Sequence, residues 1–159
     1  MTDFQKLYKQ YAKDIYNFAL FLSGSPDEAE DITAETFARI ITSKKAIILK
    51  SVKGYMLTIA RNLFLENNRL KKYRSEIKDD TPDPKNNIED NLYHKCELEA
   101  VQKFLQKFSE IDRTALLLRA EGIPYSEITK VLNISLASAK VKVHRLRIEL
   151  ARWKANRLK

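Results

Sequence analysis

The segment from residue 133 to residue 159 carries side chains suited to reading DNA. It holds eight lysines and arginines and a single acid, Glu149. Arginine can pair with the major-groove edge of guanine, and lysine can neutralise a phosphate or read the same base. Five polar positions are expected on the outer face of one helix in this segment: Ser135, Ser138, Lys140, His144 and Arg145. An ordinary cationic helix facing solvent is the alternative, but the polarity of this face favours DNA binding.

A second set of polar side chains lies near the middle of the chain. Arg61, Arg69 and Lys72 share one face of an expected helix, opposite its apolar face, and Asn62 lies beside them. The amide of Asn62 can both donate and accept hydrogen bonds on the edge of a base. Basic groups near Tyr55, Phe64 and Tyr73 suit a strand whose bases are unstacked. Core packing is the alternative for these aromatic side chains, and for Phe64 it is the preferred one. This set is therefore a candidate site for single-stranded DNA.

Acidic side chains gather on the segment from residue 27 to residue 41. Five of them are expected to remain on the outside of a helix: Asp27, Glu28, Glu30, Asp31 and Glu35. Because like charges repel, this face should point away from DNA. The charge pattern alone leaves open whether it meets solvent or a protein partner.

Catalytic chemistry finds little support in the residue types. The chain has one cysteine, two histidines and only three glycines, which excludes a structural zinc site, a disulfide framework and a phosphate-binding glycine loop. We expect no enzymatic activity and no cofactor. Without disulfides the expected location is a reducing cytoplasm, and no apolar run is long enough for insertion into a membrane.

Helical periodicity extends over the first part of the chain and predicts the elements that carry these residues. Apolar residues recur every three or four positions from Phe4 to Leu22, and Gly24 ends that helix. Ser25 is the expected N-cap of the next helix, with Pro26 in its first turn and Glu28 closing a capping box. Its buried stripe should consist of Ala29, Ile32, Thr36, Phe37 and Ile40. A long helix should follow, from about Gly54 to Tyr73.

The last third of the chain predicts a helix-turn-helix unit. A short helix over 125–132 and a long helix from about Leu136 to Trp153 flank Asn133, which suits a left-handed turn. The second helix of such a unit fits the major groove. Five apolar residues are expected to pack between the two helices: Ile128, Leu132, Leu136, Ala139 and Val143.

Charge divides the chain into three parts. Residues 1–74 carry 13 basic and 8 acidic groups, residues 75–96 carry 3 and 6, and residues 97–159 carry 13 and 7. The net charges are therefore +5, −3 and +6, and the middle part also holds two prolines and few large apolar residues. The sequence predicts an all-α protein with two small helical domains, 1–74 and 97–159, joined by a flexible linker over 75–96, with the helix-turn-helix in the second domain.

Together these motifs resemble the extracytoplasmic-function (ECF) sigma factors of the sigma-70 family, which direct bacterial RNA polymerase to promoters. The resemblance covers nearly the whole chain. It rests on DEAEDITAETF over 27–37, TIARNLF over 58–64, DRTALLLR over 112–119, EG over 121–122, YSEI over 125–128 and KVKVHR over 140–145.

The resemblance implies roles for individual residues. Asp31, Glu35 and Phe37 fall where the family binds core RNA polymerase. Asn62 falls where the family reads a flipped base of the minus-ten element, with Arg61, Arg69 and Lys72 as further minus-ten contacts. The minus-thirty-five element would be read by Ser135, Ser138, Lys140, His144 and Arg145. The family also often has an anti-sigma partner.

We therefore expect an initiation subunit that binds core polymerase, recognises two promoter elements and melts DNA. A free-standing helix-turn-helix regulator remains the main alternative, and it would bind duplex operators tightly without polymerase. An adaptor whose basic lobes engage acidic proteins is a third reading, and it would bind nucleic acid feebly at any salt concentration.

Overall fold

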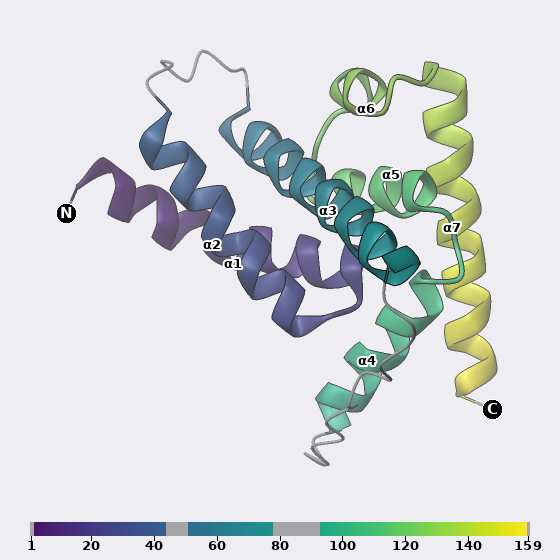
Figure 1. Cartoon of the computed structure of the whole chain (residues 1–159). Coiled ribbons are helices and arrows are strands. Elements are labelled where there is room, and N and C mark those ends of the chain that lie inside the picture. The colour runs from purple at the N-terminus through teal and green to yellow at the C-terminus, as the bar shows by residue number, and fades with distance from the viewer. Residues whose placement is uncertain (1, 44–50, 78–92, 159) are drawn as a thin grey trace.

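The chain is helical throughout the part that the structure describes. A computed structural model describes residues 2–43, 51–77 and 93–158, which contain seven helices (Figure 1). Their bounds are Asp3–Ser23 (α1), Pro26–Thr42 (α2), Val52–Ile77 (α3), Tyr93–Leu105 (α4), Glu110–Ala120 (α5), Tyr125–Leu132 (α6) and Leu136–Arg157 (α7). Within these ranges, no helix combines the length and the apolar character needed to cross a membrane.

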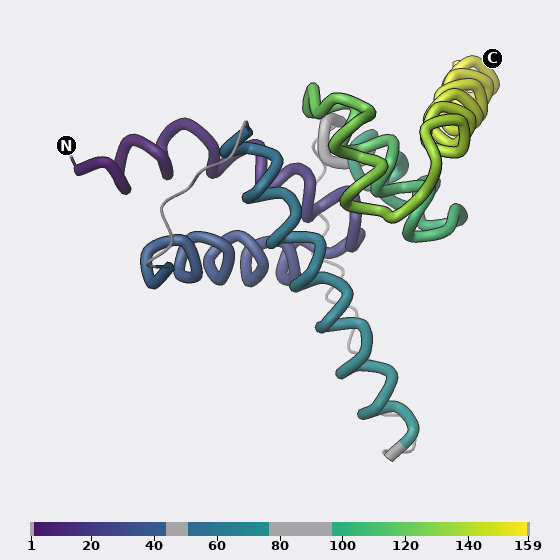
Figure 2. Tube along the Cα trace, turned by 90° about the horizontal axis from the view of Figure 1, so that it is seen from above, coloured from purple at the N-terminus to yellow at the C-terminus, as the bar shows by residue number. Residues whose placement is uncertain are grey.

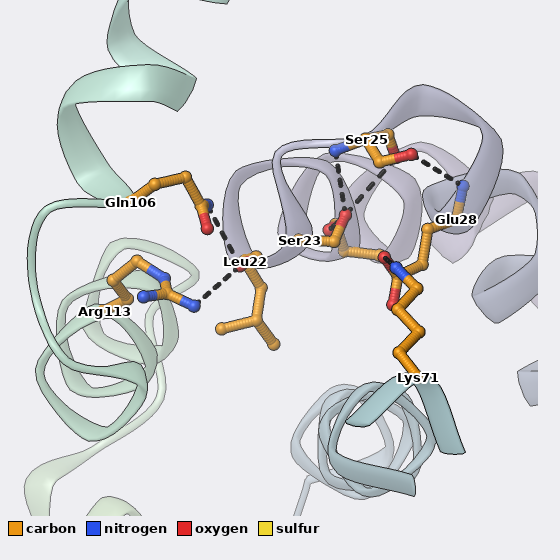
Figure 3. A network of polar contacts seen from close by, with 8 residues as sticks. Leu22, Ser23, Ser25, Glu28, Lys71, Gln106 and Arg113 are labelled. Atoms are coloured by element: carbon orange, nitrogen blue, oxygen red, sulfur yellow. Dashed lines mark hydrogen bonds and ion pairs between the residues drawn. The ribbon is translucent and has the colours of Figure 1, made fainter. Parts of the chain in front are cut away.

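The turn between α1 and α2 forms largely as predicted. Gly24 adopts a left-handed conformation with φ of 71°, and its N–H donates to the carbonyl of Leu20. Ser25 caps α2, because its hydroxyl oxygen accepts from the Glu28 N–H at 3.2 Å. The other half of the predicted capping box does not form. The N–H of Ser25 donates instead to the hydroxyl of Ser23, as Figure 3 shows.

The carboxylate of Glu28 lies inside the protein, so the prediction that it faces outward is wrong. Glu28 is 9% exposed, and its Oε2 lies 2.8 Å from Nζ of Lys71 on α3 (Figure 3). The reason is its position one turn before Ile32, which places both residues on the face of α2 that packs inward. The predicted buried stripe of α2 is confirmed in full, from Ala29 to Ile40.

Helix α3 is longer than predicted and has two different halves. Its N-terminal half packs into the core through residues such as Met56, Leu57 and Ala60, which are at most 1% exposed. From residue 68 to residue 76 every side chain is exposed. This half projects away from the other helices in Figure 2, and so it presents a free helical surface to solvent.

The helix-turn-helix forms from α6, the turn at Asn133 and α7. Asn133 has φ of 54°, as predicted for a left-handed turn, and its N–H donates to the carbonyl of Thr129. Ile128, Ala139 and Val143 are completely buried between the helices. Leu136 was expected there too, but it is 49% exposed, because it is the first residue of α7 and lies on the solvent side of that turn.

The N-terminal lobe (α1–α3) and the C-terminal lobe (α4–α7) pack against each other. Helix α1 contacts α4 and α5, and α3 contacts α5. Buried side chains of both lobes belong to one hydrophobic cluster, which runs from Ile15 on α1 to Leu146 on α7. The predicted linker begins inside α3 and ends inside α4, and residues 78–92 lie outside the described residues.

The left-handed turn between α6 and α7 leads to a stability prediction. Replacing Asn133 by Val should lower the free energy of unfolding by about 1–2 kcal/mol, because a β-branched side chain is strained at positive φ. The Asn133→Gly variant is the matched control and should stay within about 0.5 kcal/mol of the unchanged chain. Urea denaturation measures both. Equal stability of the Val and Gly variants would contradict this account of the turn.

Candidate nucleic-acid and polymerase interfaces

Helix α7 presents a cationic face at the outer side of the helix-turn-helix. Ser135 is its N-cap, with the hydroxyl oxygen accepting from the Ser138 N–H at 3.1 Å. Lys140, His144 and Arg145 are exposed along the following three turns. The buried residues Ala139 and Val143 face the rest of the lobe. The structure therefore leaves the predicted polar residues available to a ligand, since their apolar neighbours anchor the helix from behind.

Two details of this face differ from the sequence pattern. Ser138 is partly buried and lies at the edge of the face. Arg147 was not among the predicted site residues, yet it is exposed seven residues after Lys140 and three after His144. That spacing puts it on the same side of the helix. The helical period alone would therefore have added Arg147 to the candidate set.

The projecting half of α3 forms a second polar surface. An open groove there is lined by Asn62, Leu65, Glu66, Asn68, Arg69 and Lys72. Three of the four predicted minus-ten residues, Asn62, Arg69 and Lys72, are thus brought together on one exposed helix face. Glu66 was missed because an acid was not expected among DNA-binding residues. Tyr73 lies close by in sequence and is 62% exposed, as an aromatic side chain that stacks on bases would have to be.

Arg61 is not part of this groove. Its Nε lies 2.8 Å from Oε1 of Glu110 on α5, and its Nη2 donates to Oε2 at 3.3 Å. The two side chains are only 12% and 21% exposed. The C-terminal lobe covers the N-terminal half of α3, which accounts for the burial of Arg61 while Arg69 stays free. The pairing joins residues 49 positions apart, so no local sequence pattern indicated it.

Two further charged groups lie at the junction of the lobes. Burial works to lower the pKa of Lys53, but ion pairs with Glu121 at 2.8 Å and Asp14 at 3.3 Å outweigh it, so the pKa is raised. Burial lowers the pKa of Arg113, and the charge of Glu110 opposes that shift. Both groups remain cationic at neutral pH, and both hold one lobe against the other.

The acidic face of α2 borders the groove on α3. Asp31 and Glu35 are exposed, and Glu35 pairs with Arg39 at 3.4 Å. Arg39 also approaches Glu66 of α3 at 3.5 Å. These pairs are about half exposed, so they contribute little to stability and leave the face open to a partner.

Phe37, the third predicted polymerase-binding residue, is only 3% exposed. Its ring packs edge-on against Phe4 at 6.1 Å and tilted against Tyr8 at 4.9 Å between centroids. Tyr8 is itself 49% exposed. Phe37 therefore supports the surface between α1 and α2 from beneath, while Tyr8, which the sequence pattern did not single out, is accessible there.

Comparison with known proteins identifies the family to which each lobe is similar. Residues 7–75 match the family model of Sigma-70 region 2, and residues 98–150 match that of Sigma-70, region 4. The chain belongs to the ECF group of the sigma-70 family. Sigma factors of this family are non-enzymatic and direct RNA polymerase to promoters. The N-terminal lobe is thus region 2, and the C-terminal lobe is region 4 with its helix-turn-helix.

Several curated sigma factors resemble the chain over most of its length. It is 32% identical to the ECF sigma factor SigE of Mycolicibacterium smegmatis, in an alignment that covers 94% of this chain and 61% of that protein. It is 28% identical to SigM of Bacillus subtilis, with 91% of each chain covered. Among solved structures, the sigma factor RpoE of Bartonella quintana, crystallised with the anti-sigma factor NepR, matches with a TM-score of 0.72. That match covers 96% of each chain at 22% identity, which supports the fold.

The N-cap of α7 leads to a second stability prediction. Replacing Ser135 by Ala should lower the free energy of unfolding by about 1 kcal/mol, because the Ser138 N–H loses its acceptor. The Ser135→Asp variant should keep the cap and the stability, but it should weaken DNA binding by placing a negative charge on the cationic face. Thermal unfolding and DNA binding are measured in parallel. If the Ser135→Ala variant were as stable as the Ser135→Asp variant, the stabilising role of Ser135 as the N-cap of α7 would be contradicted.

Proposed function

We propose that this chain binds core RNA polymerase in the cytoplasm and directs transcription initiation at promoters. The observation that carries the proposal is that one chain bears two exposed cationic helix faces, on α3 and α7, and a separate acidic face on α2. Two DNA-binding faces on different lobes suit recognition of two separated promoter elements. Family membership supports the same activity. Polymerase, and not this chain, would carry out nucleotide transfer.

The minus-thirty-five element is assigned to α7. Lys140, His144 and Arg145 would enter the major groove, with Ser135 and Ser138 at the start of the helix near the DNA backbone. Support comes from their exposure and from the positive end of the helix dipole at Ser135, which attracts phosphate. Arg147 adds a phosphate contact on the same face.

The minus-ten element is assigned to the groove on α3. Asn62 would read an extruded base, while Arg69 and Lys72 would hold the backbone of the unpaired strand. Extruding a base costs a few kcal/mol, which stacking on an aromatic ring and hydrogen bonds can offset. The exposure of Asn62 and Tyr73 supports this role. Arg61 is proposed as a further backbone contact, which requires that its pair with Glu110 first open.

The acidic face of α2 is assigned to core polymerase, with Asp31 and Glu35 as direct contacts and Phe37 as their support. This face is exposed and negatively charged, whereas the proposed DNA-binding faces are positively charged. It therefore favours a protein partner over nucleic acid. An anti-sigma factor is a further proposed partner, because a sigma factor of the same fold has been crystallised with one.

Run-off transcription on genomic fragments tests the proposal. The purified chain and core polymerase together should produce transcripts from discrete start sites that core polymerase alone does not use. The chain without polymerase should bind the same fragments weakly. Tight, site-specific binding by the chain alone, with no change in transcription start sites, would favour a free-standing regulator and overturn the proposal.

The assignment of α7 is tested separately with Arg145→Ala. If Arg145 reads guanine in the minus-thirty-five element, the variant should lose about 1–3 kcal/mol of promoter affinity and discriminate less at one base pair. Lys154→Ala, which removes a cation near the far end of the same helix, is the control and should retain base preference. Competition binding by the chain–polymerase complex measures both. Unchanged affinity and unchanged base preference in Arg145→Ala would contradict the assignment.

A further inference from the structure

Val141 is an apolar side chain exposed at the centre of the cationic face of α7. It is 51% exposed, although valine is among the residues most often buried in proteins. Successive residues of a helix turn by about 100°, so Val141 lies about 160° around the axis from the completely buried Ala139 and Val143. Its side chain therefore points away from the rest of the lobe.

The charged residues on either side of Val141 in the sequence are held away from it. Nζ of Lys140 lies 5.9 Å from the centre of the Tyr125 ring on α6. On the opposite flank of α7, Nζ of Lys142 lies 3.0 Å from Oδ1 of Asp112 on α5. Since both cations are drawn to the flanks, the middle of the face is left to Val141.

Val141 also lies at the part of the helix-turn-helix that meets the bases. It is the sixth residue of α7, which begins at Leu136. In this motif the N-terminal residues of the second helix contact base edges in the major groove. His144 and Arg145, which are proposed to read the minus-thirty-five element, are exposed on the next turn. The proposed DNA-binding face thus presents one hydrocarbon side chain beside two polar ones.

The chemistry of valine matches one base in particular. On the major-groove edges of the four bases, the 5-methyl group of thymine is the apolar group that a side chain can contact. Valine offers no donor or acceptor, so against any other base it would displace water from polar groups and leave them without a partner. Packing against a methyl group removes both hydrocarbon surfaces from water, which is favourable.

We propose that Val141 determines specificity by packing against the 5-methyl group of one thymine in the minus-thirty-five element. The inference rests on the proposed function, because it takes α7 as the helix that reads this element. It deepens that function by adding selection for thymine at one base pair. Guanine recognition by Arg145 and phosphate neutralisation by Lys140 would not supply this selection.

Removing single methyl groups from the DNA tests the inference. A randomised duplex library is first enriched with the chain–polymerase complex. In the best-bound duplex, each thymine of the minus-thirty-five element is then replaced in turn by deoxyuridine, which lacks only the methyl group. One replacement should weaken binding by the unchanged chain about four-fold, the effect expected for one buried methyl group. The same replacement should leave binding by the Val141→Ser variant unchanged. Competition fluorescence anisotropy measures each affinity.

The matched control is Ile148→Ser, which removes an exposed aliphatic side chain from the same side of α7 two turns later. This variant should lose affinity on deoxyuridine replacement as the unchanged chain does. A second arm returns the methyl group on another base: 5-methylcytosine at the affected position should bind the unchanged chain more tightly than cytosine does. The Val141→Ser variant should not distinguish these two bases. Circular dichroism checks that both variants are folded.

Three results would overturn the inference. The first is an enriched element in which no deoxyuridine replacement weakens binding by the unchanged chain. The second is a replacement that weakens binding by Val141→Ser as much as binding by the unchanged chain. The third is a library from which neither the complex nor the chain alone enriches any sequence.

Failure of the proposed function gives a different result. Run-off transcription by the unchanged chain with core polymerase is measured separately, and it does not depend on any deoxyuridine replacement. If the chain did not act with polymerase, the library would be enriched with the chain alone. The deoxyuridine series would then still test Val141, because a free-standing helix-turn-helix protein reads duplex DNA with the same helix.

Discussion

The arrangement of this sigma factor depends on the burial of one guanidinium. Arg113 is 6% exposed, and two of its three guanidinium nitrogens find acceptors, whereas its buried Nε has no partner among the described residues. Its Nη1 donates to the carbonyl of Phe108, and its Nη2 donates to that of Leu22 on the other lobe. The same group lies 6.0 Å from the centre of the Phe64 ring on α3. One side chain thus contacts the end of α1, the loop between α4 and α5 and the middle of α3, and separating the lobes exposes it to water.

That junction decides which parts of the two proposed DNA-binding surfaces are exposed to solvent. The half of α3 next to Arg113 is covered, and Arg61 is paired there, whereas the half that carries Arg69 and Lys72 projects into solvent. Helix α7 lies on the far side of its lobe from α1, so Lys140 and Arg145 remain exposed. The packed chain therefore exposes part of the proposed DNA-binding surface on α3 and all of the one on α7.

Local interactions made much of this structure predictable from sequence. The left-handed turns at Gly24 and Asn133 and the caps at Ser25 and Ser135 each depend on residues within a few positions of one another. The errors came from packing between helices. Glu28 faces inward toward Lys71, and Leu136 lies at the surface. In each helix the spacing of the apolar residues was compatible with this side chain being either buried or exposed. The pair between Arg61 and Glu110 joins two lobes through residues far apart in sequence, and only the folded chain reveals it.

The central claim is that the contacts between the lobes, above all that of Arg113 with Leu22, hold the free chain in one packed arrangement. Electron–electron double resonance between spin labels at Lys9 on α1 and Ala151 on α7, both exposed, reports the separation directly once Cys96 is replaced by Ser. The account predicts one narrow distance distribution in the unchanged free chain, and a broader distribution that extends to longer distances in the Arg113→Ala variant. The same narrow distribution in both chains would contradict it.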